Sequence, residues 1–217
     1  MLADIRLEGV QRLAAELGAE PYEVDITDGA QVDGLAEATS ETERVVIAAG
    51  IFAPAPALEV EREEFGRILG VNTQGVFFVA QAYARLMAER GRGAIVGVAS
   101  IAARMPRMRQ ASYCGSKAGM RQALRVLGME VGPMGVRVNT VSPGPTDTPM
   151  MRTLAADHSS VDDLAEGSID AMRPRIPHGR VARPADVAAV VSFLLGPGSE
   201  HVMLEDVVVD GGELLGM

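Results

Sequence analysis

The feature that most constrains this chain is a regular alternation of short β-branched runs with longer stretches whose apolar residues recur at helical spacing. Continuous Val- and Ile-rich runs are typical of strands buried on both faces, as in parallel sheets. Strand and helix in strict succession predict a doubly wound parallel α/β sheet. The expected strands are residues 22–26, 45–49, 94–99, 136–141 and 207–210, and the expected helices are 6–17, 30–38, 63–90 with an interruption at 70–75, 112–129 and 184–195.

Residues 149–180 break this rhythm, because they are rich in Met, Ser, Asp and Pro. We expect them to form a helical lid over a substrate site. A length of 217 residues suits a single hydrophobic core. The chain is therefore expected to form one domain over residues 1–217.

Composition narrows the class of protein. A net charge of −9 disfavours a nucleic-acid partner, whose phosphates would be repelled. A single cysteine excludes an internal disulfide and favours a reducing compartment. No apolar stretch is long enough for a membrane span, and no signal-peptide pattern occurs. We therefore expect a soluble cytoplasmic protein without a membrane partner, and the three scattered histidines predict no metal site.

Lys117 is the only lysine among 20 basic residues, and it lies four residues after Tyr113. That spacing places both side chains on one face of a helix. An ammonium there favours the tyrosinate, although a shift from the usual pKa of 10 to neutrality requires about 4 kcal/mol. The alternative is an ordinary Tyr/Lys pair on a helix surface.

Two further polar residues occur at informative places. Ser100 follows the strand expected at 94–99, and ligands of parallel α/β sheets bind at the carboxyl ends of strands. Asn72 lies in the helix interruption at 70–75. Taken singly, Ser100 could cap a turn and Asn72 could bond its own loop backbone.

In this order and spacing, Asn72, Ser100, Tyr113 and Lys117 make the chain resemble the short-chain dehydrogenase/reductase family, which has a Rossmann-like fold. Ala48-Ala49-Gly50, Pro143-Gly144 and Val209-Asp210-Gly211-Gly212 add to the resemblance, which covers nearly the whole chain. It implies that Tyr113 is the general acid/base and that Ser100 orients the substrate oxygen. It implies that Lys117 lowers the pKa of Tyr113 and holds the nicotinamide ribose, and that Asn72 anchors a water leading to Lys117.

The resemblance also implies NAD as the cofactor. Asp4 would accept hydrogen bonds from the adenosine ribose and repel a 2′-phosphate, although the neighbouring Arg6 acts against that preference. Alternatively, Asp4 caps the following helix. The remaining cofactor-binding residues implied are Asp25 and Ile26 at the adenine, Ala49 and Gly50 at its ribose, Tyr113 and Lys117 at the nicotinamide ribose, and Pro143, Gly144, Thr146 and Thr148 at the carboxamide.

The chain departs from the family at its start. The family opens with a strand, a Thr-Gly-x-x-x-Gly-x-Gly loop that binds the pyrophosphate, and a helix. Met1 is expected to align with the second strand, so about 30 residues would be absent relative to the family. We expect an N-terminally truncated sheet that lacks a central strand.

Within the family, several stretches match the branch that acts on 2,3-dihydro-2,3-dihydroxybenzoate, among them Val98-Ala99-Ser100 and Ser142-Pro143-Gly144-Pro145-Thr146. This resemblance implies oxidation of a cyclohexadiene diol carboxylate to a catechol in siderophore biosynthesis. A carboxylate suits the planar fork of an arginine. Arg107 is the first candidate for binding the substrate carboxylate, and Arg152 is the second. The alternative for either residue is an ordinary arginine exposed to solvent on the surface.

Two alternatives remain open. A reductase of 3-oxoacyl thioesters or of other carbonyl compounds would use the arginines at 104, 107 and 109 as a docking patch. A truncated, non-catalytic member of the family would be unable to bind nucleotide. The resemblance further implies a homotetramer.

Overall fold

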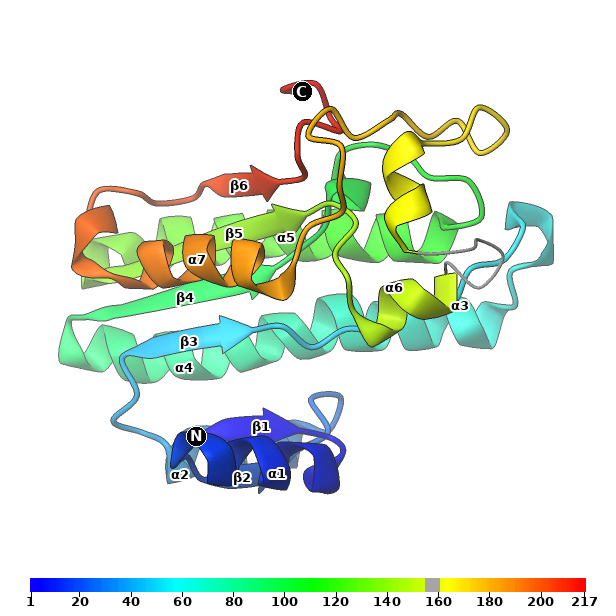
Figure 1. The fold of residues 1–217 in the computed structure, drawn as a ribbon. Helices are drawn as coiled ribbons and strands as arrows, with labels where there is room; N and C mark the ends of the chain where they lie inside the picture. Colours follow the sequence, from blue (N-terminus) through cyan, green and yellow to red (C-terminus); the bar gives the residue numbers. More distant parts are fainter. Residues whose placement is uncertain (155–160) are drawn as a thin grey trace.

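The computed structural model describes residues 1–154 and 161–217 and contains two parallel sheets (Figure 1). The larger sheet has the strand order β3-β4-β5-β6, and the smaller one pairs β1 with β2. The predicted parallel α/β architecture is confirmed. The strands are β1 (Leu2–Asp4), β2 (Pro21–Glu23), β3 (Arg44–Ile47), β4 (Gly93–Val98), β5 (Val136–Pro143) and β6 (Asp206–Val209).

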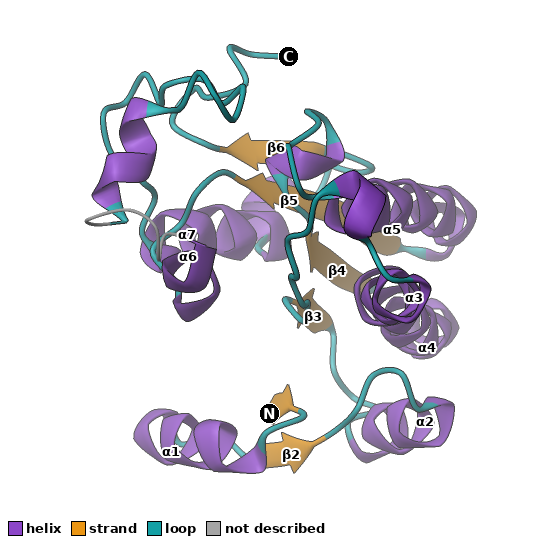
Figure 2. Cartoon of the chain, turned by 90° about the vertical axis from the view of Figure 1, so that its right-hand side faces the viewer, coloured by secondary structure: helices purple, strands orange, loops and turns teal. Residues whose placement is uncertain are grey.

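Helices cover both faces of the larger sheet. Figure 2 shows α3, α4 and α5 on one side of the strands and α6 and α7 on the other. In the smaller unit, α1 and α2 lie on opposite sides of β1 and β2. The helices are α1 (Leu7–Leu17), α2 (Gly29–Ala38), α3 (Arg62–Leu69), α4 (Val76–Arg90), α5 (Ala111–Val131), α6 (Pro149–Leu154) and α7 (Pro184–Leu195).

Helices, not strands, join the two sheets. Within the described residues, no strand pairing connects β1 or β2 with β3. Instead, Val32 and Leu35 of α2 share one buried apolar cluster with Val79 and Tyr83 of α4. The hydroxyls of Thr39 and Tyr83 also lie 2.5 Å apart. The small sheet thus lies beyond the β3 edge of the larger one and is attached to it through side-chain packing (Figure 1).

The helix interruption expected at residues 70–75 is a π-helical turn, Gly70–Gly75, between α3 and α4. A π turn adds a residue to the helical repeat and is frequent at functional sites. Its effect here is to turn Asn72 inward, where the side chain is fully buried. The interruption therefore delivers a polar side chain into the interior.

Close packing of α5 on β4 depends on Gly97. A Cβ atom at this position would lie 2.5 Å from Cδ1 of the buried Leu124. Without a side chain at Gly97, the helix that carries Tyr113 and Lys117 rests directly on the strand that ends at Val98. This contact fixes the distance at which α5 holds Tyr113 and Lys117 from the sheet.

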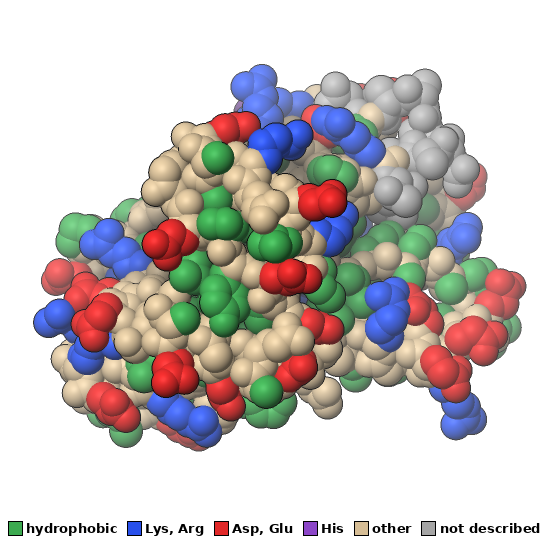
Figure 3. All heavy atoms as spheres, turned by 90° about the horizontal axis from the view of Figure 1, so that it is seen from below, with side chains coloured by type: hydrophobic (Ala, Val, Ile, Leu, Met, Phe, Trp, Pro, Cys, Tyr) green, Lys and Arg blue, Asp and Glu red, His purple; other side chains and the backbone are tan. Residues whose placement is uncertain are grey.

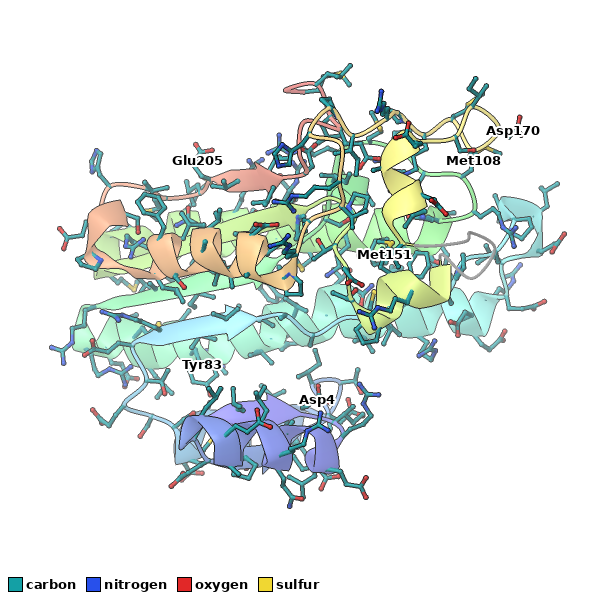
Figure 4. The ribbon with its side chains drawn as sticks, viewed as in Figure 1. Asp4, Tyr83, Met108, Met151, Asp170 and Glu205 are labelled. Atoms are coloured by element: carbon teal, nitrogen blue, oxygen red, sulfur yellow. The ribbon has the colours of Figure 1, made fainter. Side chains whose placement is uncertain are left out.

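The segment expected to be a lid contains α6 and a 3-10 helix, Asp162–Glu166. Leu164, Ile176 and Val181 form a small buried cluster of their own, against which Met151 packs. Figure 4 shows Met151 at α6, beneath this 3-10 helix. Residues 155–160, part of the expected lid and including His158, lie outside the described residues.

Acidic side chains are spread over the face shown in Figure 3, among basic and apolar ones. This distribution agrees with the net charge of −9. In the described part of the chain, no helix is long and apolar enough to cross a membrane.

We predict that Gly97→Val lowers the free energy of unfolding by about 1–3 kcal/mol, because the added atoms force Leu124 and α5 away from β4. Urea denaturation measures the change. Gly115→Ala on α5 is the matched control, since a Cβ there meets nothing within 4 Å. Ala in a helix interior should stabilise by about 0.5–1 kcal/mol. Wild-type stability of Gly97→Val would contradict this role.

Candidate active site

A cavity of about 790 Å³ opens at the carboxyl ends of β3, β4 and β5, with α6 and α7 forming its outer wall. This is the position where parallel α/β sheets bind ligands. The structure brings most of the predicted site residues to its lining. They are Gly50, Ser100, Arg107, Tyr113, Lys117, Pro143, Gly144, Thr146 and Thr148.

Tyr113 and Ser100 form the polar centre of this cavity. Ser100 lies directly after β4, and its side chain hydrogen-bonds Tyr113. The Oγ atom of Ser100 also accepts a hydrogen bond of 3.1 Å from the backbone N–H of Ala102. Phe52 packs edge-on against the Tyr113 ring, with the centroids 5.0 Å apart. Both hydroxyls are thus fixed beside each other on an apolar wall.

Lys117 is buried beneath them, with 3% of its surface exposed. Its ammonium donates a hydrogen bond of 2.8 Å to the carbonyl oxygen of Val98, the last residue of β4. Nζ lies 6.0 Å from the centroid of the Tyr113 ring. The predicted one-turn spacing on a helix therefore places the ammonium under the phenol.

The pKa shifts differ from the sequence-based expectation. Burial raises the pKa of Tyr113, and the hydrogen bond from Ser100 only partly opposes that rise. Burial also lowers the pKa of Lys117, from 10.5 to about 8. The lysine is the group whose pKa moves toward neutrality, because loss of water destabilises its charge. The net shift of the Tyr113 pKa is therefore upward, opposite to the direction expected from the sequence.

Asn72 joins three segments below the cavity. Its amide Nδ2 donates to the Ile51 carbonyl (2.9 Å) and to Ser116 Oγ (3.0 Å), and its Oδ1 accepts from the Ile51 N–H (2.8 Å). Ser116 in turn donates to the carbonyl oxygen of Tyr113 at 2.8 Å. Asn72 thereby fixes the loop after β3 to α5. The predicted water-anchoring role of Asn72 stays a prediction.

Gly50 lies where the loop after β3 passes closest to these groups. A Cβ atom there would lie 3.3 Å from both Asn72 Oδ1 and Lys117 Nζ. Any side chain would thus crowd the two polar atoms. The absence of a side chain at Gly50 therefore keeps the space beside Lys117 Nζ unfilled.

The residues expected at the carboxamide lie on the opposite rim of the cavity. Thr146 Oγ1 donates to the Gly144 carbonyl at 3.0 Å, and Thr148 Oγ1 accepts from the Met151 N–H at 3.3 Å. These contacts shape the turn between β5 and α6. Pro143 and Gly144 follow directly at the end of the strand.

The expected adenine-side residues are not among those lining the cavity. Asp4 accepts a hydrogen bond of 2.9 Å from the N–H of Arg6, the residue before α1, so the alternative that Asp4 caps this helix is wrong. Arg6 itself lines the cavity. Asp25 accepts from the N–H and hydroxyl of Thr27. Ile26 packs against the main core, and Ala49 is exposed. Their roles at a nucleotide stay predictions.

The two candidate arginines lie in different surroundings. Arg107 lines the cavity, and only 9% of its side chain is exposed. Arg152 pairs with Asp147 at 2.8 Å on the surface, with 64% of its side chain exposed, and is not among the lining residues. The structure thus brings Arg107 but not Arg152 to the site.

Sequence reasoning missed four residues of this region. They are Phe52, Ser116, Arg173 and Glu213, which support or line the cavity but were not among the predicted site residues. Ser116 was detectable, since it lies one helical turn after Tyr113. The pairing of Glu213 with Arg107 and Arg173 could not be detected from the sequence, because Glu213 is far from both arginines along the chain.

Comparisons with known proteins agree with this geometry. A family model described as enoyl-(acyl carrier protein) reductase matches residues 1–213. A 2,3-dihydro-2,3-dihydroxybenzoate dehydrogenase of Bacillus subtilis is 34% identical, covering 92% of this chain and 78% of that protein. A D-threitol dehydrogenase of Mycolicibacterium smegmatis is 35% identical, covering 96% and 80%. A short-chain type dehydrogenase/reductase structure from Mycobacterium marinum has a TM-score of 0.83 at 30% identity, covering 97% and 83%.

Because the Lys117 ammonium is buried, we predict that the difference in stability between the wild type and a variant without this charge depends on pH. Because Lys117 has a lowered pKa in the folded chain, it destabilises the fold fully below about pH 8. That penalty disappears as the pH rises toward the unfolded value of 10.5. We expect Lys117→Met to raise the free energy of unfolding by about 2 kcal/mol at pH 7, after allowing about 1 kcal/mol for the lost hydrogen bond.

Denaturant titrations of both proteins across this pH range measure the difference. The gain should shrink between pH 8 and 10.5 and turn into a loss of about 1 kcal/mol above that range, where only the missing hydrogen bond counts. A variant that is less stable at pH 7, or a gain that does not change with pH, would contradict burial of a charged Lys117.

Proposed function

The chain belongs to the short-chain dehydrogenase/reductase family and is an oxidoreductase of that family, and on this premise we propose that it oxidises 2,3-dihydro-2,3-dihydroxybenzoate to 2,3-dihydroxybenzoate with NAD. The observation that carries the proposal is the buried Arg107 in the same cavity as Ser100 and Tyr113. A cation in the same cavity as a proton-transfer pair suits a hydroxylated ring that bears a carboxylate. The similarity to the B. subtilis enzyme supports the same substrate.

A nicotinamide cofactor fits the residues around Lys117. Gly50 leaves room beside the ammonium, and Thr146 and Thr148 offer hydroxyls on the opposite rim. When bound, NAD supplies the acceptor for the hydride. Its preference over NADP rests on Asp4, whose carboxylate lies at the end of β1 (Figure 4).

The chain's own residues supply the proton chemistry. Ser100 holds the substrate hydroxyl that is to be oxidised. Because burial raises the pKa of Tyr113, the phenol must first release its own proton, and the resulting tyrosinate then takes the proton of the substrate hydroxyl. With a pKa of about 8, Lys117 can lie in either protonation state near neutrality, and so can pass that proton on. The apolar surfaces of Phe52 and Met151 exclude water from the reacting ring. Aromatisation drives the reaction, so the protein's task is orientation.

Other substrates define the competing proposals. The D-threitol relative acts on a neutral polyol, and a 3-oxoacyl thioester reductase would need a basic docking surface. Arg104, however, is engaged with Asp206 at 2.8 Å, which weakens the docking-patch alternative. A non-catalytic member of the family remains the third alternative.

The wider setting of the enzyme belongs to the same proposal. Formation of a catechol carboxylate supports a role in siderophore biosynthesis. The single cysteine supports a reducing, cytoplasmic location. A homotetramer without nucleic-acid or membrane partners is proposed from the family resemblance.

We predict that the wild-type chain forms NADH from NAD and 2,3-dihydro-2,3-dihydroxybenzoate, and that Tyr113→Phe lowers kcat at least about a hundredfold. Binding of NAD, followed by thermal shift, should stay nearly unchanged, since only one hydroxyl is removed. NADH absorbance measures turnover.

Tyr83→Phe provides the matched control, because Tyr83 bonds Thr39 away from the cavity. That variant should keep its activity and lose about 1 kcal/mol of stability. Full activity of Tyr113→Phe would refute the acid/base assignment. A folded wild type that shows no thermal shift with millimolar NAD would favour the non-catalytic alternative.

A further inference from the structure

We propose that Arg107 and Arg173, held together by Glu213, form an anion-recognition element that makes this cavity prefer carboxylates to neutral polyols. Arg173 is a second cationic ligand to the substrate, and Glu213 is a positioning residue. The inference rests on the proposed dehydrogenase function and defines the substrate class of the same cavity.

The three side chains form a buried triad. Glu213 Oε1 accepts from Arg107 Nη2 at 2.8 Å and from Arg173 Nε at 3.2 Å. The exposed side-chain fractions are 9% for Arg107, 14% for Arg173 and 0% for Glu213. Both arginines line the cavity that contains Tyr113. The triad joins the loop before α5, the segment before α7 and the turn after β6.

The triad has an unbalanced charge. Two guanidiniums face a single carboxylate, so it carries a net charge of +1 in a place with little water. Arg107 Nη1 and Glu213 Oε2 are both buried, and neither has a hydrogen-bond partner within residues 1–154 and 161–217. A buried donor without an acceptor is costly, and a ligand carboxylate supplies both the acceptor and the missing negative charge.

A second triad of two arginines and one carboxylate lies nearby, and it differs from the first in having no arginine in the cavity lining. Asp206 also binds two arginines, Arg104 at 2.8 Å and Arg121 at 3.2 Å. Its other oxygen accepts from the hydroxyls of Thr140 and Ser142. Although Arg121 Nε is likewise buried without a partner in the described structure, neither Arg104 nor Arg121 lines the cavity. That triad ties β5 and β6 to α5 and cannot meet a ligand.

Glu213 restricts where the two guanidiniums can lie. Sharing one carboxylate oxygen brings them close together despite their mutual repulsion. Paired planar donors match a carboxylate, which a single flexible cation does less well. A neutral polyol offers no charge to this pair, and its binding would leave Arg107 Nη1 without a charged partner.

Calorimetric titration with 2,3-dihydroxybenzoate and with catechol, in the presence of NAD, tests the inference. The wild type should bind the carboxylate roughly tenfold to a hundredfold more tightly than catechol. Arg173→Gln should lose most of this preference because it removes one of the two cations. Glu213→Asp should weaken the preference as well, because it keeps the negative charge but its shorter side chain no longer holds both guanidiniums in place. Arg121→Gln, the matched control in the other triad, should keep it.

Arg107→Lys is a second variant that retains the charge but loses the planar geometry, and its preference should be intermediate. Equal wild-type binding of the two ligands, or absence of binding, would overturn the inference. So would an Arg173→Gln variant that keeps the preference and loses only thermal stability, since the triad would then be purely structural.

Hydride transfer distinguishes failure of this inference from failure of the proposed function. Wild type should oxidise the neutral cyclohexadiene diol that lacks the carboxylate with a higher KM than the carboxylate substrate, and Arg121→Gln, which lies outside the cavity lining, should show the same KM ratio. Tyr113→Phe should lose turnover but keep the carboxylate preference. Turnover without preference would refute the anion element alone, whereas preference without any turnover would refute the dehydrogenase proposal and leave the element supported.

Discussion

The burial of the Lys117 ammonium is the constraint on which the rest of this site depends. A charge removed from water needs polar partners, and the chain supplies the Val98 carbonyl at the end of β4. The close approach at Gly97 sets α5 on the sheet, and the bare backbone of Gly50 leaves the ammonium room. A pKa of about 8 is the physical consequence of this position.

The cavity combines two halves of different origin. The half proposed to transfer protons consists of Ser100, Tyr113 and Lys117, which come from the end of β4 and from α5. The cationic half depends on Arg173 and Glu213, from segments outside the large sheet. A family fold can in this way keep its chemistry while peripheral segments set the charge of the substrate it accepts.

The sequence predicted the larger features well, for identifiable physical reasons. Helical and strand periodicity located every strand of the large sheet and the interruption that carries Asn72. The spacing of Tyr113 and Lys117 on one helix brought both into one cavity. These features depend on local patterns, which are visible without a structure.

Long-range electrostatics was less predictable. The direction of the Tyr113 pKa shift depends on how much water the fold removes, which no spacing reveals. Arg107 and Arg152 look alike in the sequence, yet only one is buried at the cavity. Lys117 gives the most direct test, because a chain with a single lysine yields one side-chain signal when labelled with ¹³C-lysine. Its NMR titration should have a midpoint of about 8, whereas a midpoint at the ordinary 10.5 would contradict a buried ammonium at this site.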